Sequence, residues 1–454
     1  MARKVKKDFL FGVATSATQV EGGWNQGGKS PSVWDMYSQR GLIQNKHTCF
    51  TSCDSYNRLE EDLELIRNLG VNSYRFSINW TRIQPGGRGK VNQEGVAYYN
   101  RLIDGLLSMG VTPMVTLFHW DLPVELHDNG GFLNRDIVER FAEYGRIIAE
   151  CFGDRVELFT VFNEPLVVLD FQYVHPVGGY TQPCSNQEVF EAVHNLLLCN
   201  AVATEALRRY SKRKVQVGMV NCTMLCTPET DSEADVEAAR QATFKVGDTI
   251  LDNTVTFWDP LLYGKYDPRI VEKFQIDTSF IQPGDMELIQ CKPDFMGYNV
   301  YTGNRVRSDG NGGWKPVAPS VNAPVSRMGN EFIATADCMY WGIRFMYEKY
   351  KLPIYITENG MDQAEWKTLH GKIDDPMRID YIERYFSWLM QAKASGVDIR
   401  GYFVWSLLDN FEWSSGFTRR FGLVYVDFET GERTPKSSYY WYSDLIRHYQ
   451  NGEV

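Results

Sequence analysis

Residues 158–165 read Leu-Phe-Thr-Val-Phe-Asn-Glu-Pro, and residues 352–360 read Leu-Pro-Ile-Tyr-Ile-Thr-Glu-Asn-Gly. Each stretch is a short apolar run typical of a buried strand, and each ends in a glutamate, Glu164 or Glu358, beside a turn-forming residue. A buried strand rarely ends in a charged side chain unless that charge has a partner or a chemical task. The pattern therefore raises the question of whether these two carboxyl groups, far apart in the sequence, meet in the folded chain.

Apolar runs of this type recur along the whole chain. Eight runs of strand length lie at residues 11–17, 73–79, 112–118, 158–162, 215–220, 295–300, 354–357 and 401–406. Amphipathic segments with helical spacing lie between them, at residues 54–69, 94–109, 135–152, 188–210, 339–350 and 376–394. Alternating strands and helices imply a parallel sheet covered by helices, and eight strands close a barrel. The pattern predicts an α/β protein, a (β/α)8 TIM barrel formed as a single domain over residues 1–454.

An open, doubly wound sheet is the alternative arrangement of alternating strands and helices. Such a sheet commonly carries a glycine-rich turn between its first strand and the helix that follows. The glycine pairs at residues 22–23 and 27–28 have a different spacing, and no helix is expected directly after them. The sequence therefore favours the closed barrel.

In a barrel of this type, the residues at the carboxyl ends of the strands surround one mouth. Polar and aromatic residues end or follow seven of the eight runs: Gln19, Glu21, Arg75, Asn79, Trp80, His119, Trp120, Asp121, Asn163, Glu164, Asn299, Tyr301, Glu358, Asn359, Trp405, Glu412 and Trp413. Two carboxyl groups that face one another are the minimal machinery for cleaving a glycosidic bond. We therefore expect Glu164 and Glu358 to meet at this mouth.

The composition is that of a globular protein, with 43% hydrophobic and 23% charged residues. The formal net charge of −10 disfavours binding to nucleic acid or to anionic membranes. Aromatic residues make up 14% of the chain, and most of them must belong to the core. A minority could line a sugar site, because flat ring faces match the C–H faces of pyranoses.

The N-terminal residues and the cysteines indicate the cellular compartment in which the protein is expected. The basic residues 1–7 are followed by no apolar stretch of signal-peptide length, and no segment is long enough to span a membrane. The nine cysteines are scattered, and the close pairs Cys49/Cys53 and Cys222/Cys226 lack zinc-ribbon spacing. A metal site formed by His47 with the first pair is the alternative to a reduced thiol set. We expect a cytoplasmic protein with no metal and no cofactor.

Six blocks of sequence resemble those of the family-1 glycoside hydrolases, the β-glucosidase-like enzymes, in the same order along nearly the whole chain. They read Gln-Val-Glu-Gly at 19–22, Tyr-Arg-Phe-Ser at 74–77, His-Trp-Asp-Leu-Pro at 119–123, Phe-Asn-Glu-Pro at 162–165, Ile-Thr-Glu-Asn-Gly at 356–360 and Trp-Ser-Leu-Leu-Asp-Asn-Phe-Glu-Trp at 405–413. The resemblance implies an exo-acting enzyme that hydrolyses small β-glycosides or short oligosaccharides and retains the configuration of the sugar.

The resemblance also implies roles for the residues at the reaction centre. Glu358 would be the nucleophile that forms a covalent glycosyl-enzyme, and Glu164 the acid and then the base. A retaining pair requires carboxyl groups roughly 5 Å apart and different environments for the two. Arg75 and Tyr301 would keep Glu358 ionised. Asn299 would either support Glu358 or contact the sugar.

Eight further residues would bind the non-reducing sugar by the same resemblance: Gln19, His119, Trp120, Asn163, Trp405, Glu412, Trp413 and Phe421. Asn163 would contact the 2-hydroxyl, Trp405 would form a stacking floor, and Phe421 would lie beside the 6-position. Buried polar groups that lose their partner hydroxyl are penalised, so this set would discriminate between sugars.

The choice of sugar stays open between glucose, galactose and fucose. Glu412 and Trp413 resemble the branch of the family that binds a free 4- and 6-hydroxyl. Arg419 and Arg420 leave a 6-phospho-β-glycoside as an alternative substrate. A catalytically silent barrel that binds glycans is the alternative from another functional class, although such relatives usually lack one of the two glutamates.

Two stretches on the leaving-group side depart from the pattern of the family. Residues 171–180 replace a glycine-rich loop, and residues 328–332 lack the tryptophan that often forms a platform for the leaving group. We therefore expect an aglycone preference different from that of a typical cellobiase, with contacts from Tyr173, His175 or Trp314.

Overall fold

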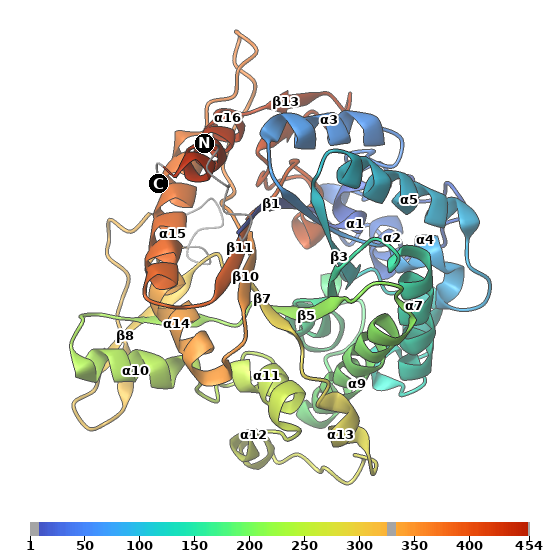
Figure 1. The fold of residues 1–454 in the computed structure, drawn as a ribbon. Helices are drawn as coiled ribbons and strands as arrows, with labels where there is room; N and C mark the ends of the chain where they lie inside the picture. Colours follow the sequence, from blue (N-terminus) through green and yellow to red (C-terminus); the bar gives the residue numbers. More distant parts are fainter. Residues whose placement is uncertain (1–8, 325–332, 453–454) are drawn as a thin grey trace.

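A closed barrel of eight parallel strands forms the centre of the computed structural model, which describes residues 9–324 and 333–452 (Figure 1). The strands are β1 (Leu10–Ala14), β2 (Ser73–Ser77), β3 (Thr112–Phe118), β4 (Leu158–Asn163), β5 (Gln216–Asn221), β7 (Phe295–Asn299), β10 (Ile354–Asn359) and β11 (Ile399–Trp405). Their order around the barrel is β1-β11-β10-β7-β5-β4-β3-β2, so β1 closes the ring by pairing with both β11 and β2. All eight predicted runs are strands, which confirms the (β/α)8 fold.

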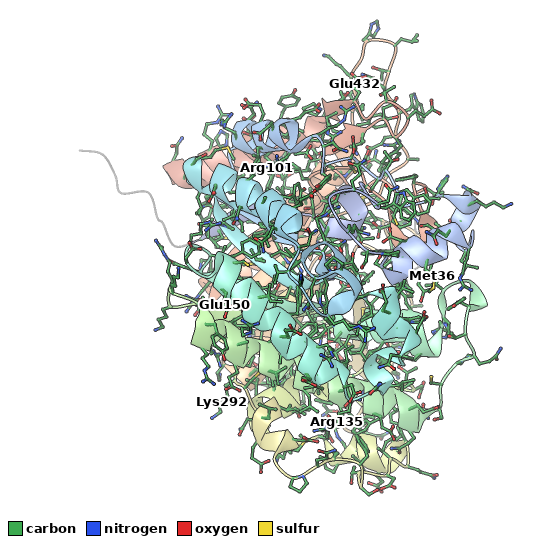
Figure 2. All side chains as sticks on the ribbon, turned by 90° about the vertical axis from the view of Figure 1, so that its right-hand side faces the viewer. Met36, Arg101, Arg135, Glu150, Lys292 and Glu432 are labelled. Atoms are coloured by element: carbon green, nitrogen blue, oxygen red, sulfur yellow. The ribbon has the colours of Figure 1, made fainter. Side chains whose placement is uncertain are left out.

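Helices cover the outside of the barrel (Figure 1). The six predicted helical segments correspond to α3 (Leu59–Leu69), α5 (Gln93–Ser108), α7 (Ile137–Phe152), α9 (Asn186–Tyr210), α14 (Cys338–Tyr350) and α15 (Pro376–Ala394). The first helix begins five residues later than predicted because Ser52 and Asp54 adopt left-handed backbone conformations, with φ of 49° and 56°. Arg101 on α5 and Glu150 on α7 mark the solvent-facing sides of these helices (Figure 2).

The interior of the barrel is filled by large side chains from alternate strands. Phe403 on β11 lies so close to β1 that a Cβ atom added at Gly12 would be 2.2 Å from its ring. Phe295 on β7 lies in the same way against Gly218 on β5, where the distance would be 2.4 Å. These two glycines are needed because a close-packed interior cannot accommodate both a Cβ atom and the ring.

Several elements are not predicted from the sequence. The helix α16 (Ser437–Asn451) buries Tyr439, Tyr442 and Ile446, and it contacts α3 and α15. The segments that follow β5 and β7 form a separate three-stranded sheet, which consists of β6 (Leu225–Pro228), β8 (Gly303–Ser308) and β9 (Trp314–Pro316). A two-stranded sheet of β12 (Val424–Val426) and β13 (Arg433–Pro435) follows β11.

The first predicted run ends earlier than expected. Residues Ala17–Val20 form a helical turn, α1, in place of the last part of the strand. This turn places Gln19 at the mouth of the barrel. Within residues 9–324 and 333–452, no helix is long and apolar enough to cross a membrane.

Candidate active site

A cavity of about 330 Å³ lies at the carboxyl ends of the barrel strands. It brings together most of the residues singled out from the sequence: Gln19, His119, Trp120, Asn163, Glu164, Asn299, Tyr301, Glu358, Trp405, Glu412, Trp413 and Phe421. Arg75 is buried beneath it and reaches two of these side chains. Glu164 and Glu358, distant in the sequence, therefore line one cavity.

Glu358, within β10, is held by a cation and a hydroxyl. Arg75 donates from Nη1 to Oε1 of Glu358 at 2.6 Å, and Tyr301 donates from its hydroxyl to Oε2 at 2.7 Å. Burial raises the pKa of the Glu358 carboxyl above its ordinary value, and Arg75 and then Tyr301 offset part of this rise. The carboxylate form of Glu358 is thus stabilised by two charge-assisted hydrogen bonds.

Glu164 has a different environment, although it is equally buried. Its Oε1 accepts a hydrogen bond from the side-chain amide of Asn299 at 2.7 Å, and within the described chain it forms no ion pair. Burial and the negative charge of Glu358 raise the pKa of Glu164 to about 8. At neutral pH Glu164 is therefore a neutral carboxylic acid, next to a Glu358 carboxyl group that is paired with an arginine.

The backbone at Glu164 fixes the direction of its side chain. Glu164 directly follows β4 and adopts a left-handed conformation, with φ of 46°. Pro165 then begins the short helix α8 (Pro165–Leu169). Trp120 and Trp413, which also line the cavity, have φ of 73° and 52°. Left-handed backbone at non-glycine residues costs free energy, and it concentrates where function requires a particular geometry.

Asn163 connects the parts of the site. Its Oδ1 accepts hydrogen bonds from Arg75 Nη2 at 2.6 Å and from Asn299 Nδ2 at 3.1 Å. Its Nδ2 must then be the donor to Nε2 of His119, at 2.9 Å. This arrangement leaves the proton of the neutral imidazole on Nδ1 of His119. That atom is buried and has no hydrogen-bond partner among the described residues.

Burial and the positive charge of Arg75 hold the pKa of His119 well below its ordinary value, so the ring stays neutral. The ring stacks against Trp405, with centroids 5.9 Å apart, and against Trp413, at 5.8 Å. Trp120 packs on Trp413 at 4.3 Å and donates from Nε1 to the Asn163 carbonyl at 2.9 Å. An aromatic wall thus lies beside the polar groups.

Glu412 is a third carboxyl group in the same cavity. Gln19 donates from Nε2 to Glu412 at 3.1 Å and to the side chain of Asn410 at 3.0 Å. Burial and the charge of Glu358 raise the pKa of Glu412 to about 8. Together these groups offer donors and acceptors at one side of the aromatic wall, the combination that binds a polyhydroxylated ring.

The chain matches the family model of glycosyl hydrolase family 1 over residues 1–451. It belongs to this family. A β-glucosidase A from Thermotoga maritima is 39% identical over 448 residues, which cover 98% of each chain. A bifunctional β-D-glucosidase/β-D-fucosidase from Bifidobacterium breve is 36% identical over 466 residues, which cover 97% of each chain.

Solved structures agree with this assignment. The structure of the Thermotoga maritima β-glucosidase in complex with glucoimidazole superposes with a TM-score of 0.87 at 38% identity, and the match covers 98% of this chain and 99% of that chain. The resemblance seen in the six sequence blocks is therefore confirmed, and the protein is a glycoside hydrolase.

Three residues singled out for the leaving group lie outside the cavity of this family-1 hydrolase. Tyr173 is buried in the π-helical turn Asp170–Val174, where its hydroxyl accepts from the Phe132 N–H at 2.8 Å. The His175 side chain is 76% exposed and contacts Asp170. Trp314 is half-buried on β9 and lines a second, wider cavity. Residues 328–332, the other stretch singled out on this side, lie outside the described residues.

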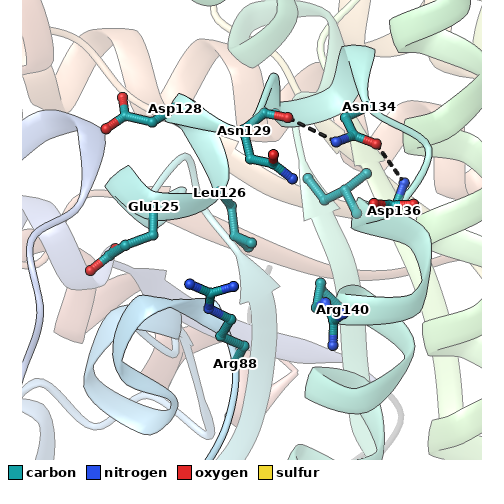
Figure 3. A pocket seen from close by; sticks show the side chains of 10 residues that line it. Arg88, Glu125, Leu126, Asp128, Asn129, Asn134, Asp136 and Arg140 are labelled. Atoms are coloured by element: carbon teal, nitrogen blue, oxygen red, sulfur yellow. Dashed lines mark hydrogen bonds between the residues drawn. The ribbon is translucent and has the colours of Figure 1, made fainter.

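The second cavity of the hydrolase, about 1120 Å³, adjoins the first, because Met224 and Thr302 line both. A third cavity, of about 410 Å³, lies apart at the surface, between α6 (Val124–Asp128) and α7 (Figure 3). It is lined by exposed charged side chains such as Arg88. The side chain of Asn134, which also lines this cavity, accepts a hydrogen bond from the Asp136 N–H at 3.0 Å (Figure 3). The hydrogen bond between Asn134 and Asp136 stabilises the turn before α7. Neither Glu164 nor Glu358 lines this surface cavity.

The fifth strand also contributes to the cavity, which was not predicted from the sequence. Cys222, Thr223 and Met224 directly follow β5 and line the cavity of the two glutamates. No polar residue was singled out after this strand, although the other seven each provided one. The position of these residues in the sequence could have indicated them, because the first residues beyond any barrel strand lie at the mouth of the barrel.

Proposed function

We propose that this hydrolase is a retaining, exo-acting β-glycosidase that releases a terminal β-D-glucosyl residue. The observation that carries the proposal is the contrast between two buried carboxyl groups in one cavity. Glu358 is paired with Arg75, whereas Glu164 has a pKa of about 8. A retaining mechanism needs this combination of an ionised nucleophile and a protonated acid.

In the first step Glu358 attacks the anomeric carbon while Glu164 protonates the departing oxygen, and a covalent glycosyl-enzyme forms. The ester no longer carries the negative charge that raises the pKa of Glu164. The pKa of Glu164 therefore falls, and its carboxylate can take a proton from the water that attacks the anomeric carbon in the second step and displaces Glu358. Tyr301 and Arg75 hold the departing Glu358 carboxylate.

The residues around the two glutamates support binding of a hexose. His119 has a ring N–H without a partner among residues 9–324 and 333–452, and Gln19 and Glu412 provide an amide and a carboxyl group. Asn163 accepts hydrogen bonds from Arg75 and Asn299 and would contact the 2-hydroxyl, where hydrogen bonds strengthen at the transition state. Trp405 would serve as the stacking floor, with Trp120, Trp413 and Phe421 as walls.

An unphosphorylated sugar is the better substrate on electrostatic grounds. Arg419 is paired with Asp362 at 3.3 Å, and Arg420 is paired with Asp409 at 2.7 Å. Both cations are therefore already neutralised.

The wider cavity supports a bulky aglycone. Its lining is mainly apolar and includes Trp314, Pro316, Val317 and Ile333. We propose that aryl or alkyl leaving groups extend from Glu164 past Met224 into this space. The relative named as a bifunctional glucosidase and fucosidase supports β-fucosides as further substrates.

The compartment belongs to the same proposal. All nine cysteines are free, which is typical of a reducing compartment. We propose a cytoplasmic enzyme that acts on small glycosides, including cellobiose. Fractionation of the cells that express the protein tests this placement, and recovery outside the cytoplasmic fraction would contradict it.

The central experiment is a panel of p-nitrophenyl β-glycosides, with cellobiose as a disaccharide, assayed with the wild type and with Glu358→Gln. We expect β-glucoside and β-fucoside hydrolysis by the wild type and a loss of at least about 10⁴-fold in the variant, because the nucleophile is removed. Glu60→Gln, at an exposed position on α3, is the matched control. Activity that persisted in Glu358→Gln would disprove the assignment of the nucleophile.

A further inference from the structure

The charges around the wide cavity have the opposite sign to that of the protein as a whole. The chain has a formal net charge of −10. Among the described residues that line the cavity of about 1120 Å³, however, no side chain carries a carboxyl group, and the charged ones are Lys245 and Arg305. Most of the other lining residues are apolar. The cavity thus combines apolar surface with positive charge, whereas the neighbouring cavity of Glu164 and Glu358 is rich in carboxyl groups.

Arg305, on β8, is already neutralised. Its Nη2 donates to both carboxylate oxygens of Asp337, at 3.0 and 2.9 Å, and its Nη1 donates to the Pro228 carbonyl at 2.9 Å. These contacts tie β8 to the end of β6 and to the residue before α14. The guanidinium of Arg305 therefore has a structural task and contributes little charge to a ligand.

Lys245 is in a different situation. It is exposed, and within residues 9–324 and 333–452 its ammonium forms neither an ion pair nor a hydrogen bond. Its Nζ lies over the ring of Trp314, 5.1 Å from the ring centroid. The face of an aromatic ring attracts a cation but does not neutralise it, and an ammonium group has three N–H donors. The wide cavity thus contains one fixed cation without a counter-ion in the described chain.

The fold determines how far Lys245 lies from the reaction centre. Lys245 follows α10 (Glu233–Thr243), which packs against β6 and β8 (Figure 1). The Cys226 N–H of β6 donates to Thr243 Oγ1 at 3.2 Å, so the end of α10 lies beside Cys226. Cys226 is two residues beyond Met224, which lines both cavities. Two residues of extended chain span roughly 7 Å, about the length of a substituted phenyl ring.

We propose that the wide cavity selects aryl β-glucosides whose aglycone ends in a carboxylate, and that Lys245, held on the face of Trp314, binds this carboxylate. The inference rests on the proposed function, because it takes the wide cavity as the site of the leaving group. The aryl ring of the aglycone lies against apolar residues such as Pro316 and Val317, and the carboxylate at its far end pairs with the ammonium. Lys245 is thus a residue that determines specificity for the leaving group.

The experiment compares 4-(2-carboxyethyl)phenyl β-D-glucoside with its methyl ester. The saturated linker keeps the acidity of the departing phenol nearly the same in both substrates, so the ratio of their kcat/KM values reports recognition of the carboxylate. This ratio does not depend on the fraction of folded enzyme. It is measured for the wild type, for Lys245→Met, which keeps much of the volume without the charge, and for Lys245→Arg, which keeps the charge.

We expect the acid-to-ester ratio to fall about three- to fivefold in Lys245→Met, because an ion pair at an exposed position contributes only modestly to binding. Lys245→Arg should keep the ratio within about twofold of the wild-type value. Lys212→Met, at an exposed position between α9 and β5, is the matched control and should leave the ratio unchanged. Equal ratios in the wild type and Lys245→Met would overturn the proposal.

The salt dependence separates recognition of charge from packing. An exposed ion pair is screened by salt, so a rise in NaCl from about 20 to about 500 mM should reduce the difference between the ratios of the wild type and Lys245→Met. A loss of packing alone would affect the acid and the ester alike and would not respond to salt. A difference between the two enzymes that salt leaves unchanged would therefore also contradict the proposal.

Failure of this inference is distinguishable from failure of the proposed function. If the protein is not a β-glucosidase, the wild type will hydrolyse neither the acid nor the ester. If only the role of Lys245 is wrong, the wild type will hydrolyse both substrates, and Lys245→Met will have the wild-type ratio.

Discussion

Arg75 on β2 donates a 2.6 Å hydrogen bond to Glu358 on β10, although β1 and β11 separate these two strands around the barrel. The contact spans the mouth, and the second terminal nitrogen of Arg75 reaches Asn163 on β4 at 2.6 Å. One buried guanidinium therefore fixes side chains from two other strands. Its planar fork makes this geometry possible, and a lysine could not reproduce it.

Substitution of Arg75 by Lys should lower kcat/KM by about 10²–10³-fold, because Glu358 and Asn163 both lose a fixed partner. Loss of the close guanidinium raises the pKa of Glu358, whose ionised form is the active one. The acidic limb of the pH profile of kcat/KM should therefore move to higher pH, which steady-state assays between pH 4 and 8 will measure. Arg101→Lys, on the exposed side of α5, should change neither quantity.

The pKa of Glu164 predicts the pH at which kcat/KM of the wild type decreases on the basic side of its pH profile. Because Glu164 must be protonated to assist the departing oxygen, kcat/KM for phenyl β-glucoside should fall as the pH rises through about 8. In Glu164→Gln this limb should disappear, and kcat/KM for the phenyl glucoside should fall by about 10³-fold. Azide, which needs no general base, should restore turnover of 2,4-dinitrophenyl β-glucoside by that variant. A basic limb retained in Glu164→Gln would contradict the assignment.

The barrel could be predicted from the sequence because each of its strands is buried on both faces and reads as a continuous apolar run. The helices were predictable from their amphipathic spacing, and α15 lies at the predicted bounds, Pro376–Ala394. The two small sheets were not predictable. The strands β9, β12 and β13 have only three residues each, too few to show an alternation of apolar and polar residues.

The candidate site was predictable wherever a polar residue directly ended an apolar run, since strand ends determine position at the mouth. The loops were not, because their path depends on tertiary contacts. The π-helical turn Asp170–Val174 directs Tyr173 towards Phe132 and leaves His175 in solvent. Cys222 escaped notice because a lone cysteine after an apolar strand has the appearance of a core residue.

The aglycone side predicts a difference between substrates. Trp314→Ala should raise KM at least about threefold for glucosides with extended aryl aglycones, because the wide cavity loses its largest apolar surface, while methyl β-glucoside should be unaffected. His175→Ala, at an exposed position, is the matched control and should leave both substrates unchanged. Equal KM values for Trp314→Ala and the wild type on every aglycone would mean that the wide cavity does not bind the leaving group.

Glu412 predicts a conflict between stability and activity. The pKa of Glu412 is raised from 4.5 to about 8 in the folded chain, so the folded state holds a proton that the unfolded state has released between these values. Stability therefore falls as the pH rises through this window, and the full penalty of a buried carboxylate is present above pH 8.

Glu412→Gln removes that penalty. Its Tm should exceed that of the wild type by a few degrees at pH 9 and by little at pH 4.5, as measured by calorimetry. The same variant should raise KM for β-glucosides, because we propose that this carboxyl group binds the sugar hydroxyls. A Tm difference independent of pH would show that Glu412 is not buried as an ionisable group.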